Sequence, residues 1–193
     1  MSLWLVRHAQ PLIEPGICYG ATDVPADARA TLAAAQAMAK VLPRDVVILS
    51  SPLQRCEQLS QSICRLRPDL TYKLDERLVE MDFGTWEGQR WDDIAPAELQ
   101  NWTDAFDTWR CGGAECVDEM MARVAELWNT ARASGHKAVW ITHAGVIRAA
   151  TLVAGGTRSI SRAEQWPVEG PAFGTHRVLA YAPPESHSYF PSR

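Results

Sequence analysis

Short apolar runs alternate along the chain with longer stretches in which apolar residues recur every three to four positions. The runs are rich in valine, isoleucine, leucine and tryptophan, which is typical of strands buried in a parallel sheet. Strands are predicted over residues 3–6, 46–49, 71–73, 138–142 and 177–181. Helices are predicted over residues 29–41, 53–66, 117–133 and 145–154. This alternation favours a three-layer α/β/α fold, in which helices cover both faces of a mainly parallel sheet.

The first predicted helix carries a row of small apolar residues. Ala33, Ala37 and Val41 are spaced by four positions, so we expect them to form a continuous stripe on one side of the helix. The chain has 193 residues, which is long enough for one domain with a proper core. We therefore predict a single domain over residues 1–193. The proline- and serine-rich tail from Pro183, which includes His187, is expected to be loosely ordered.

A different pattern covers residues 87–115. Four aromatic residues follow one another at largely helical spacing, the segment is interrupted by Pro96, and it ends in two glycines. The aromatic residues are Trp91, Trp102, Phe106 and Trp109. We predict a small helical, cap-like insertion here. Its rings either pack the insertion against the sheet or contact the organic part of a substrate, and we expect most to pack and one or two to line the mouth of a site.

Candidate chemistry gathers at the ends of three predicted strands. Arg7 and His8 end the first strand, and His143 ends the strand over residues 138–142. The strand over residues 46–49 breaks at Ser-Ser-Pro and enters a helix with Arg55 in its first turn. Because ligands of open α/β sheets bind outside the carboxyl ends of the strands, we expect these side chains to converge. One guanidinium group can donate two hydrogen bonds to two oxygens of a phosphate. The two arginines and two histidines together therefore suit a phosphate monoester.

Four motifs in this order resemble those of the histidine phosphatase superfamily, the phosphoglycerate mutase-like group. The resemblance spans nearly the whole chain, and four ordered motifs are far more specific than any one of them. The motifs are Arg7-His8, Ser50-Ser51-Pro52-Leu53-Gln54-Arg55, the segment from Leu78 to Gly88, and Thr142-His143-Ala144-Gly145. Further substrate contacts are expected from residues beside these motifs. Those residues are Gln10, Tyr19, Gly20 and Ala144.

The resemblance implies a metal-independent phosphomonoesterase that needs no cofactor. His8 would attack phosphorus and form a phosphohistidine, while Arg7, Arg55 and His143 would bind the phosphoryl oxygens. We expect His143 to act as a charged donor rather than as a base. Glu80 is at the family position of the acid that protonates the leaving group and later activates water. Its apolar neighbours in the sequence could keep it protonated. On charge alone, four other carboxylates compete for this role: Asp75, Glu76, Asp82 and Glu87.

The loop from Arg7 to Gly20 most resembles bacterial α-ribazole phosphatases of cobalamin biosynthesis, which makes α-ribazole 5′-phosphate the first substrate to consider. The alternatives are a broad-specificity phosphatase, a phosphoglycerate mutase and a phosphate-binding module without activity. Two positions depart from the family pattern. Ala9 replaces the usual glycine, which a permitted backbone conformation tolerates. The region around Glu14 lacks an asparagine of the mutases, which argues against a mutase.

The composition of the chain limits the kinds of binding partner that we expect. The formal net charge is −4 and no basic cluster is present, so nucleic acid is not expected as a partner. The first strand follows Met1 directly, and no apolar run approaches the length of a membrane span, so we expect a cytoplasmic protein. We expect it to be a monomer or a homodimer. Five cysteines lack the spacing of a zinc site and are expected to be reduced. Cys18 could lie near the phosphate site and be sensitive to oxidation.

Overall fold

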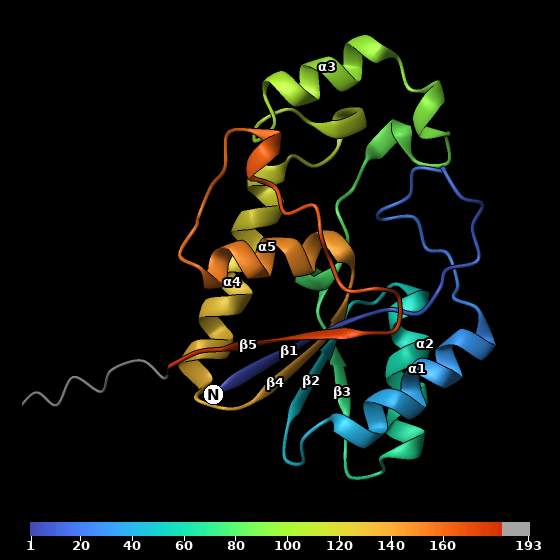
Figure 1. The fold of residues 1–193 in the computed structure, drawn as a ribbon, viewed down its shortest axis with the longest axis vertical. Helices are drawn as coiled ribbons and strands as arrows, with labels where there is room; N and C mark the ends of the chain where they lie inside the picture. Colours follow the sequence, from blue (N-terminus) through green and yellow to red (C-terminus); the bar gives the residue numbers. More distant parts are fainter. Residues whose placement is uncertain (183–193) are drawn as a thin grey trace, which may run out of the picture.

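The computed structural model describes residues 1–182, so the tail from Pro183, with His187, lies outside the described residues. A five-stranded sheet runs through the centre in the order β3-β2-β4-β1-β5 (Figure 1). The strands are β1 (Ser2–Arg7), β2 (Val47–Ser50), β3 (Tyr72–Leu74), β4 (Ala138–Thr142) and β5 (His176–Ala180). Strands β1 to β4 pair in parallel, and β5 lies antiparallel to β1 at the edge. The sheet is therefore mainly parallel, as predicted.

Two pairs of helices cover the two faces of the sheet, with α1 and α2 on one side and α4 and α5 on the other (Figure 1). The helices are α1 (Ala28–Val41), α2 (Gln54–Leu66), α3 (Pro96–Asp104), α4 (Val117–Ser134) and α5 (Ala144–Ala154). The nine predicted strands and helices are confirmed, each boundary to within one residue. Helix α3 lies within the predicted helical insertion and begins at Pro96, since proline is favoured in the first helical turn and does not interrupt the helix there.

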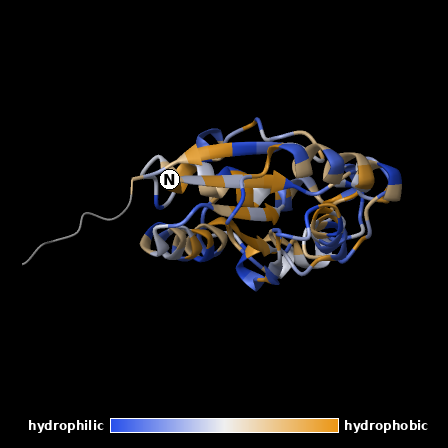
Figure 2. Ribbon diagram, turned by 90° about the horizontal axis from the view of Figure 1, so that it is seen from below, coloured by the Kyte–Doolittle hydropathy of each residue, from blue (hydrophilic) through white to orange (hydrophobic). Residues whose placement is uncertain are grey.

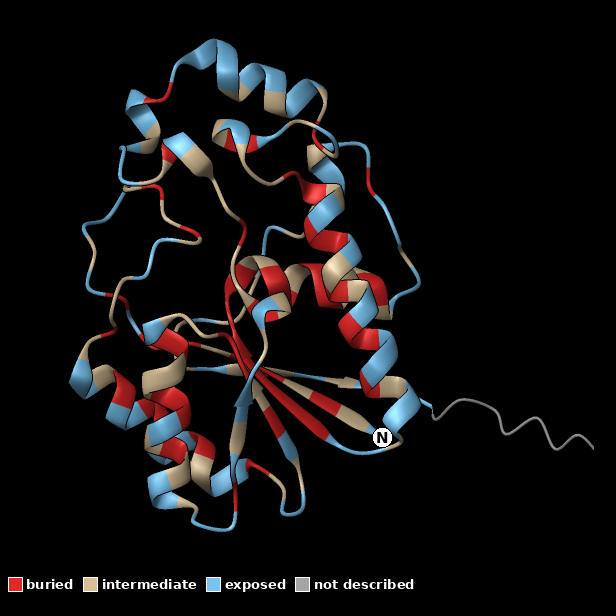
Figure 3. Cartoon of the chain, turned by 180° about the vertical axis from the view of Figure 1, so that it is seen from behind, coloured by how far each residue is buried: buried red, intermediate tan, exposed pale blue. Residues whose placement is uncertain are grey.

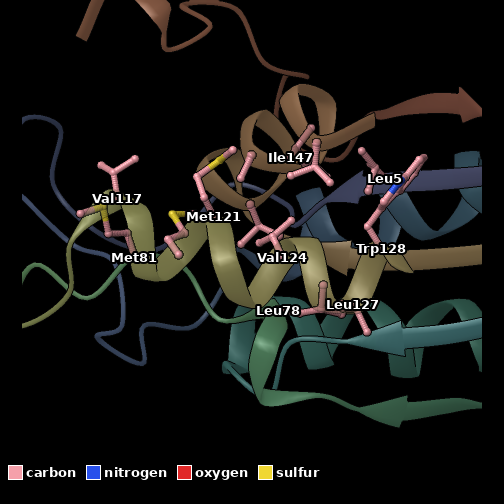
Figure 4. Close-up of a cluster of buried hydrophobic side chains, with 14 of the residues drawn as sticks. Leu5, Leu78, Met81, Val117, Met121, Val124, Leu127, Trp128 and Ile147 are labelled. Carbon is pink, nitrogen blue, oxygen red and sulfur yellow. The ribbon is translucent and has the colours of Figure 1, made fainter. Parts of the chain in front are cut away.

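Alternation along the strands divides the core into two clusters. Leu3 and Leu5 of β1 pack with α4 and α5, whereas Val6 packs with α1 and α2. Figure 4 shows Leu5 among the side chains of α4 and Ile147 of α5. Hydrophobic residues are concentrated on the central strands (Figure 2), and the same strands are largely buried, whereas α3 is not (Figure 3). Because both faces are covered, the strands read as continuous apolar runs in the sequence.

The expected stripe of α1 is wrong. Ala33, Ala37 and Val41 are all exposed. The face that packs against the sheet and α2 is displaced by one position, and its buried residues are Thr31, Ala34, Ala35 and Met38. In a helix with alanine on several sides, alanine spacing does not distinguish one face from another. The helix is oriented so that the large apolar side chain of Met38 is buried, and Ala34 and Ala35 lie on the same face.

The strand register aligns the carboxyl ends of the parallel strands. Arg7 at the end of β1 is opposite Thr142 at the end of β4, and Ser50 at the end of β2 is opposite Ile141. The segment 87–115 with α3 lies beyond the carboxyl ends of the parallel strands (Figure 1). Residues following β1, β2 and β4 are thereby brought to one place beneath that segment. Within residues 1–182, no helix combines the length and hydrophobicity needed to cross a membrane.

Candidate active site

Four side chains meet where β1, β2 and β4 end. Arg7 is the last residue of β1 and His8 follows it, Arg55 lies in the first turn of α2, and His143 is the N-cap of α5. The ring centroids of His8 and His143 are 5.1 Å apart. Arg55 and both histidines are buried. The structure thus brings together the residues that the strand ends predicted, and their alignment follows from the parallel register.

The imidazole of His8 is held as a neutral ring with one defined tautomer. Its Nδ1 atom is 2.7 Å from the carbonyl oxygen of Ala9, so Nδ1 donates a hydrogen bond and Nε2 keeps its lone pair. Burial and the nearby guanidinium of Arg55 lower the pKa of His8 to about 3. A neutral imidazole with a free Nε2 is a nucleophile at neutral pH.

His143 is also neutral, which differs from the expected charged donor. Arg55 donates from Nε to Nδ1 of His143 over 3.2 Å, so the proton of His143 is on Nε2, 2.9 Å from the hydroxyl oxygen of Ser51. Burial, Arg55 and His8 lower the pKa of His143 well below its ordinary value. The physical reason is the buried guanidinium beside the ring, which sequence spacing did not reveal. His143 remains a hydrogen-bond donor, but as a neutral ring.

The guanidinium of Arg55 is fixed by a loop that the sequence analysis placed near the substrate. Its Nη1 and Nη2 atoms donate to the carbonyl oxygens of Thr22 (2.8 Å) and Gly20 (2.6 Å). Tyr19 presents its ring 5.4 Å from the guanidinium carbon. Arginine has five N–H donors, and these contacts with the one to His143 use three, which leaves two for an oxyanion. Gly20 is required here because a Cβ atom would be 1.8 Å from the carbonyl oxygen of Met81.

Arg7 is held by a segment that carries no recognised motif. It donates from Nη1 to the carbonyl oxygen of Pro171 over 3.0 Å, and its guanidinium lies 3.8 Å from the ring centroid of Phe173. The same ring is 5.4 Å from that of His8. Pro171 and Phe173 precede the antiparallel edge strand and lie far from the other motifs in the sequence. Sequence reasoning missed both, because only the pairing of β5 with β1 brings them here.

Glu80 joins this cluster at the first turn of α5. Its Oε2 atom accepts the backbone N–H of Gly145 over 2.9 Å, and Oε1 accepts that of Met81 over 3.1 Å. Gly145 lies two residues after His143, so Glu80 stands next to the histidine end of the helix. A Cβ atom on Gly145 would be 2.3 Å from Oε1, so the close approach requires glycine.

Three of the four competing carboxylates make other contacts. Asp75 binds Arg77 at 2.7 Å, and Asp82 accepts the N–H of Gly84. Glu87 accepts the N–H groups of Ala21 (2.8 Å) and Thr22 (2.6 Å) and so holds the loop that fixes Arg55. From the sequence, Glu87 is expected only as a competitor of Glu80 for the role of the acid. Its place in the Trp86-Glu87-Gly88 motif was the available signal for this supporting contact.

A model of the histidine phosphatase superfamily (branch 1) matches residues 3–173. The chain belongs to this superfamily. Among solved structures, the chain is similar to a mycobacterial glucosyl-3-phosphoglycerate phosphatase, with 22% sequence identity, a TM-score of 0.76 and coverage of 92% of this chain and 88% of that one. It is similar to TTHB049 from Thermus thermophilus, with 27% identity, a TM-score of 0.72 and coverage of 94% of each chain. No curated protein matches the sequence.

Three other predictions about this histidine phosphatase have different outcomes. Ala144 is buried at the first position of α5, beside His143. Gln10 is exposed, and its side-chain amide lies 3.5 Å from the carbonyl oxygen of Pro11 rather than in the cluster. Cys18 is fully buried, and burial followed by the charge of Glu87 raises its pKa to about 12. A buried thiol that stays protonated is poorly reactive, which argues against the expected sensitivity of Cys18 to oxidation.

An apolar cavity of about 470 Å³ adjoins the cluster and shares Glu80 and Gly145 with it. Five rings line it, three of them from the segment 87–115, which is more than the one or two expected there. The rings are Phe83, Trp91, Trp102, Phe106 and Trp166. They also contact one another, with Trp102 and Phe106 stacked at 5.4 Å. Packing within the segment and lining of the cavity are therefore performed by the same side chains.

The cavity lining also contains hydrogen-bond donors. Arg148 lies one turn beyond Gly145 on α5 and donates from Nη2 to the carbonyl oxygen of Val168 over 2.8 Å. Within residues 1–182, Arg148 Nε and Trp102 Nε1 are buried and have no hydrogen-bond partner. Unpaired buried donors cost free energy, so a ligand with acceptor atoms would be favoured beside these residues. Within the same range, no group of three or more histidine, cysteine or carboxylate side chains is arranged to hold a metal ion.

Proposed function

We propose that this histidine phosphatase hydrolyses a phosphate monoester in two steps through a phosphohistidine at His8. Membership of the superfamily supports phosphatase activity. The observation that carries the proposal is the neutral His8, with Nδ1 bound to Ala9 and the Nε2 lone pair free, near the guanidinium groups of Arg7 and Arg55. Such a set combines a nucleophile with fixed positive charge for the phosphoryl oxygens.

In the first step, Nε2 of His8 attacks phosphorus and the bond to the leaving oxygen breaks. The leaving oxygen takes a proton from Glu80, and the phosphoryl group stays on His8. In the second step, water attacks phosphorus, Glu80 takes the water proton, and the bond between nitrogen and phosphorus breaks to release inorganic phosphate. Arg7 and Arg55 would hold the equatorial oxygens in both steps. Neutral His143 would join them when its only N–H, on Nε2, exchanges the hydroxyl oxygen of Ser51 for a phosphoryl oxygen.

For the substrate, we propose α-ribazole 5′-phosphate. Its flat, apolar dimethylbenzimidazole ring suits a cavity that is lined by five aromatic rings and begins at Glu80. Its ribose and ring-nitrogen acceptors suit the unpaired donors of Trp102 and Arg148. Free cysteines throughout the chain are typical of a reducing compartment, so we propose that the reaction takes place in the cytoplasm.

Arg148 favours a second candidate, a phosphate ester that carries another anionic group. A carboxylate would pair with this guanidinium, as in glucosyl-3-phosphoglycerate, the substrate named for one structural neighbour. A broad-specificity phosphatase would favour neither substrate. A mutase would return the phosphoryl group to a second hydroxyl, and a phosphate-binding module would form no covalent intermediate.

The chemical step is tested by rapid alkaline quench with p-nitrophenyl phosphate and with an alkyl phosphate. Wild-type enzyme is expected to form a phosphohistidine that is stable in alkali and labile in acid, with and without EDTA. His8→Ala should lose both turnover and phosphoenzyme. Glu80→Gln should slow alkyl phosphate hydrolysis by roughly a hundredfold to ten-thousandfold. Turnover without any phosphohistidine, or full turnover by His8→Ala, would contradict the mechanism.

The substrate is tested with a panel of α-ribazole 5′-phosphate, glucosyl-3-phosphoglycerate, 3-phosphoglycerate and simple sugar phosphates. We expect the highest kcat/KM for α-ribazole 5′-phosphate, because binding energy from its ring lowers the barrier at the phosphate. A preference of about tenfold for a small anionic phosphate would favour the second candidate instead. Transfer of phosphate to a second position of 3-phosphoglycerate would identify a mutase.

A further inference from the structure

The peptide segment that carries Glu80 is held by an arginine of α4. Arg123 donates from Nη1 to the carbonyl oxygens of Arg77 (2.8 Å) and Val79 (2.7 Å). Val79 immediately precedes Glu80, so this contact fixes the peptide plane from which the Glu80 side chain departs. Arg123 has only 19% of its side chain exposed, and the contact is therefore largely shielded from water.

A carboxylate completes the attachment on the other side of Glu80. Glu115 accepts from Nε of Arg123 at 2.7 Å and from Nη2 at 3.0 Å, a two-point pair in which its own side chain is 16% exposed. The Oε2 atom of Glu115 also accepts the N–H of Asp82 at 3.1 Å, and its backbone N–H donates to the carbonyl oxygen of Asp82 at 3.2 Å. The pair thus binds the chain before and after residues 80 and 81.

Neither Arg123 nor Glu115 has a hydrogen bond to the Glu80 carboxylate, which is bound to Gly145 and Met81. We propose that Arg123 and Glu115 are positioning residues that hold the Glu80 carboxylate at the leaving-group side of the phosphate site. This inference rests on the proposed function, since it assigns to the pair an effect on proton transfer. A shift of the backbone at residue 80 would move the carboxylate away from the leaving oxygen without moving His8 or Arg55.

An ion pair between α4 and the start of the segment that carries Glu80 provides a matched control. Arg77 binds Glu126, one turn beyond Arg123 on α4, at 2.7 Å, and Glu126 is 69% exposed. The Glu126 carboxylate has no hydrogen bond to residues 79–82 among the described contacts. Glu126→Gln therefore removes an ion pair between α4 and the start of the same segment but leaves the attachment around Glu80 intact.

The test compares Arg123→Met, Glu115→Gln and Glu126→Gln with the wild-type enzyme. Arg123→Met and Glu115→Gln should lower kcat/KM for an alkyl phosphate by roughly tenfold to a hundredfold, part of the whole effect of general acid catalysis. The burst of p-nitrophenol from p-nitrophenyl phosphate should stay within about threefold of wild type, because this leaving group departs without a proton. Phosphohistidine should accumulate, since the attack of water still needs Glu80. Glu126→Gln should match the wild type for both substrates.

Equal losses for both substrates, or no loss for either, would overturn the inference. If Arg123→Met does not fold, Glu115→Gln decides, because it keeps the shape of the side chain; loss of folding in both would show that the pair serves the fold alone and would also overturn it. The wild-type quench separates the two proposals. A wild type without phosphohistidine contradicts the proposed function, whereas a wild type with it and variants that lose both activities equally contradicts only the positioning role.

Discussion

Burial sets the charge of the two histidines at the strand ends. His8 and His143 lie within 5.1 Å of each other and beside the guanidinium of Arg55, so a proton on either ring would be both desolvated and repelled. In the proposed reaction, the fixed positive charge of Arg55 would bind the phosphoryl group, and the same charge keeps His8 neutral. One side chain thus accounts for two requirements of the proposed reaction.

This arrangement predicts a pH dependence of stability. Unfolded His8 has a pKa near 6.5, whereas burial and Arg55 lower the folded pKa to about 3. Between these values the unfolded chain binds the proton and the folded chain does not. The contribution of His8 to the free energy of unfolding should therefore be fully present above about pH 6.5. Below that pH, it should fall by up to about 1.4 kcal/mol per pH unit. His143 adds to the fall in the same direction.

Urea unfolding between about pH 5 and pH 7 measures this slope. His8→Asn should be less steep than the wild type by about 1 kcal/mol per pH unit, because one proton fewer is taken up on unfolding. His136→Asn, which changes an exposed histidine, is the matched control. Identical slopes for His8→Asn and the wild type would show that burial does not suppress the charge of His8.

At the scale of elements, the first turn of α5 connects the phosphate site with the proposed proton carrier. His143 caps the helix, and the N–H of Gly145 binds Glu80 two residues later. A Cβ atom on Gly145 would be 2.3 Å from Oε1 of Glu80 and 2.9 Å from the terminal methyl of Met120. Both neighbours are the ends of side chains, and the carboxylate of Glu80 is the nearer one, so it would have to move farther.

Gly145→Ala should therefore slow hydrolysis of an alkyl phosphate more than it slows the burst from p-nitrophenyl phosphate. We expect a loss of roughly tenfold or more for the alkyl substrate, since proton transfer depends on a carboxylate within hydrogen-bond reach. Gly155→Ala at the other end of α5 is the control, because its Cβ atom would be no closer than 3.4 Å to its neighbours. Steady-state and quenched-flow kinetics give both readouts. An unchanged alkyl rate would show that Glu80 does not depend on this close contact.

Helix α1 offers a direct comparison between its buried and exposed alanines. Ala35 is fully buried between the helix and the sheet, whereas Ala37 is exposed. Ala35→Leu should lower the free energy of unfolding by about 1–3 kcal/mol, because the packed interface has no room for the larger side chain. Ala37→Leu should change it by no more than about 0.5 kcal/mol. Chemical denaturation of both variants checks the assignment, and the reverse order would restore the face expected from alanine spacing.

At the scale of the whole molecule, the site is assembled from segments far apart in the sequence. The sheet edge supplies Arg7, His8, Arg55 and His143, and the segment 87–115 together with the loop around Trp166 forms the aromatic cavity beside Glu80. In the proposed reaction, the chemical step and the recognition of the organic group would thus belong to different parts of the fold. Changes in the cavity should alter substrate preference while leaving His8 chemistry intact.

Trp102→Ala tests this division. We expect kcat/KM for α-ribazole 5′-phosphate to fall by about tenfold or more, since a buried ring contact contributes on the order of 1 kcal/mol beyond its apolar area. For a simple sugar phosphate the change should be small. Trp109→Ala is the matched control, because Trp109 belongs to the same segment but not to the cavity lining. Equal losses for both substrates would show that Trp102 supports the fold of the segment rather than substrate choice.

Sequence patterns alone predict the layered fold and the edge of the sheet at which Arg7, His8, Arg55 and His143 meet. Continuous apolar runs can be satisfied only in a sheet covered on both faces, and parallel strands bring Arg7, Arg55 and His143 to the same edge. The four motifs in their order were sufficient to predict that the chain belongs to the histidine phosphatase superfamily. These features depend on local composition and on topology, which the sequence pattern carries directly.

The tertiary structure alone decided the charge of His143, the buried face of α1 and the partners of Arg7. The neutral state of His143 follows from a guanidinium that comes from another helix, and Phe173 reaches Arg7 because β5 pairs with β1. The hydrogen bonds of Arg123 to Val79 and of Glu115 to Asp82 likewise join segments that no sequence motif connects. Contacts between distant residues depend on packing in three dimensions, and no spacing along the chain encodes them.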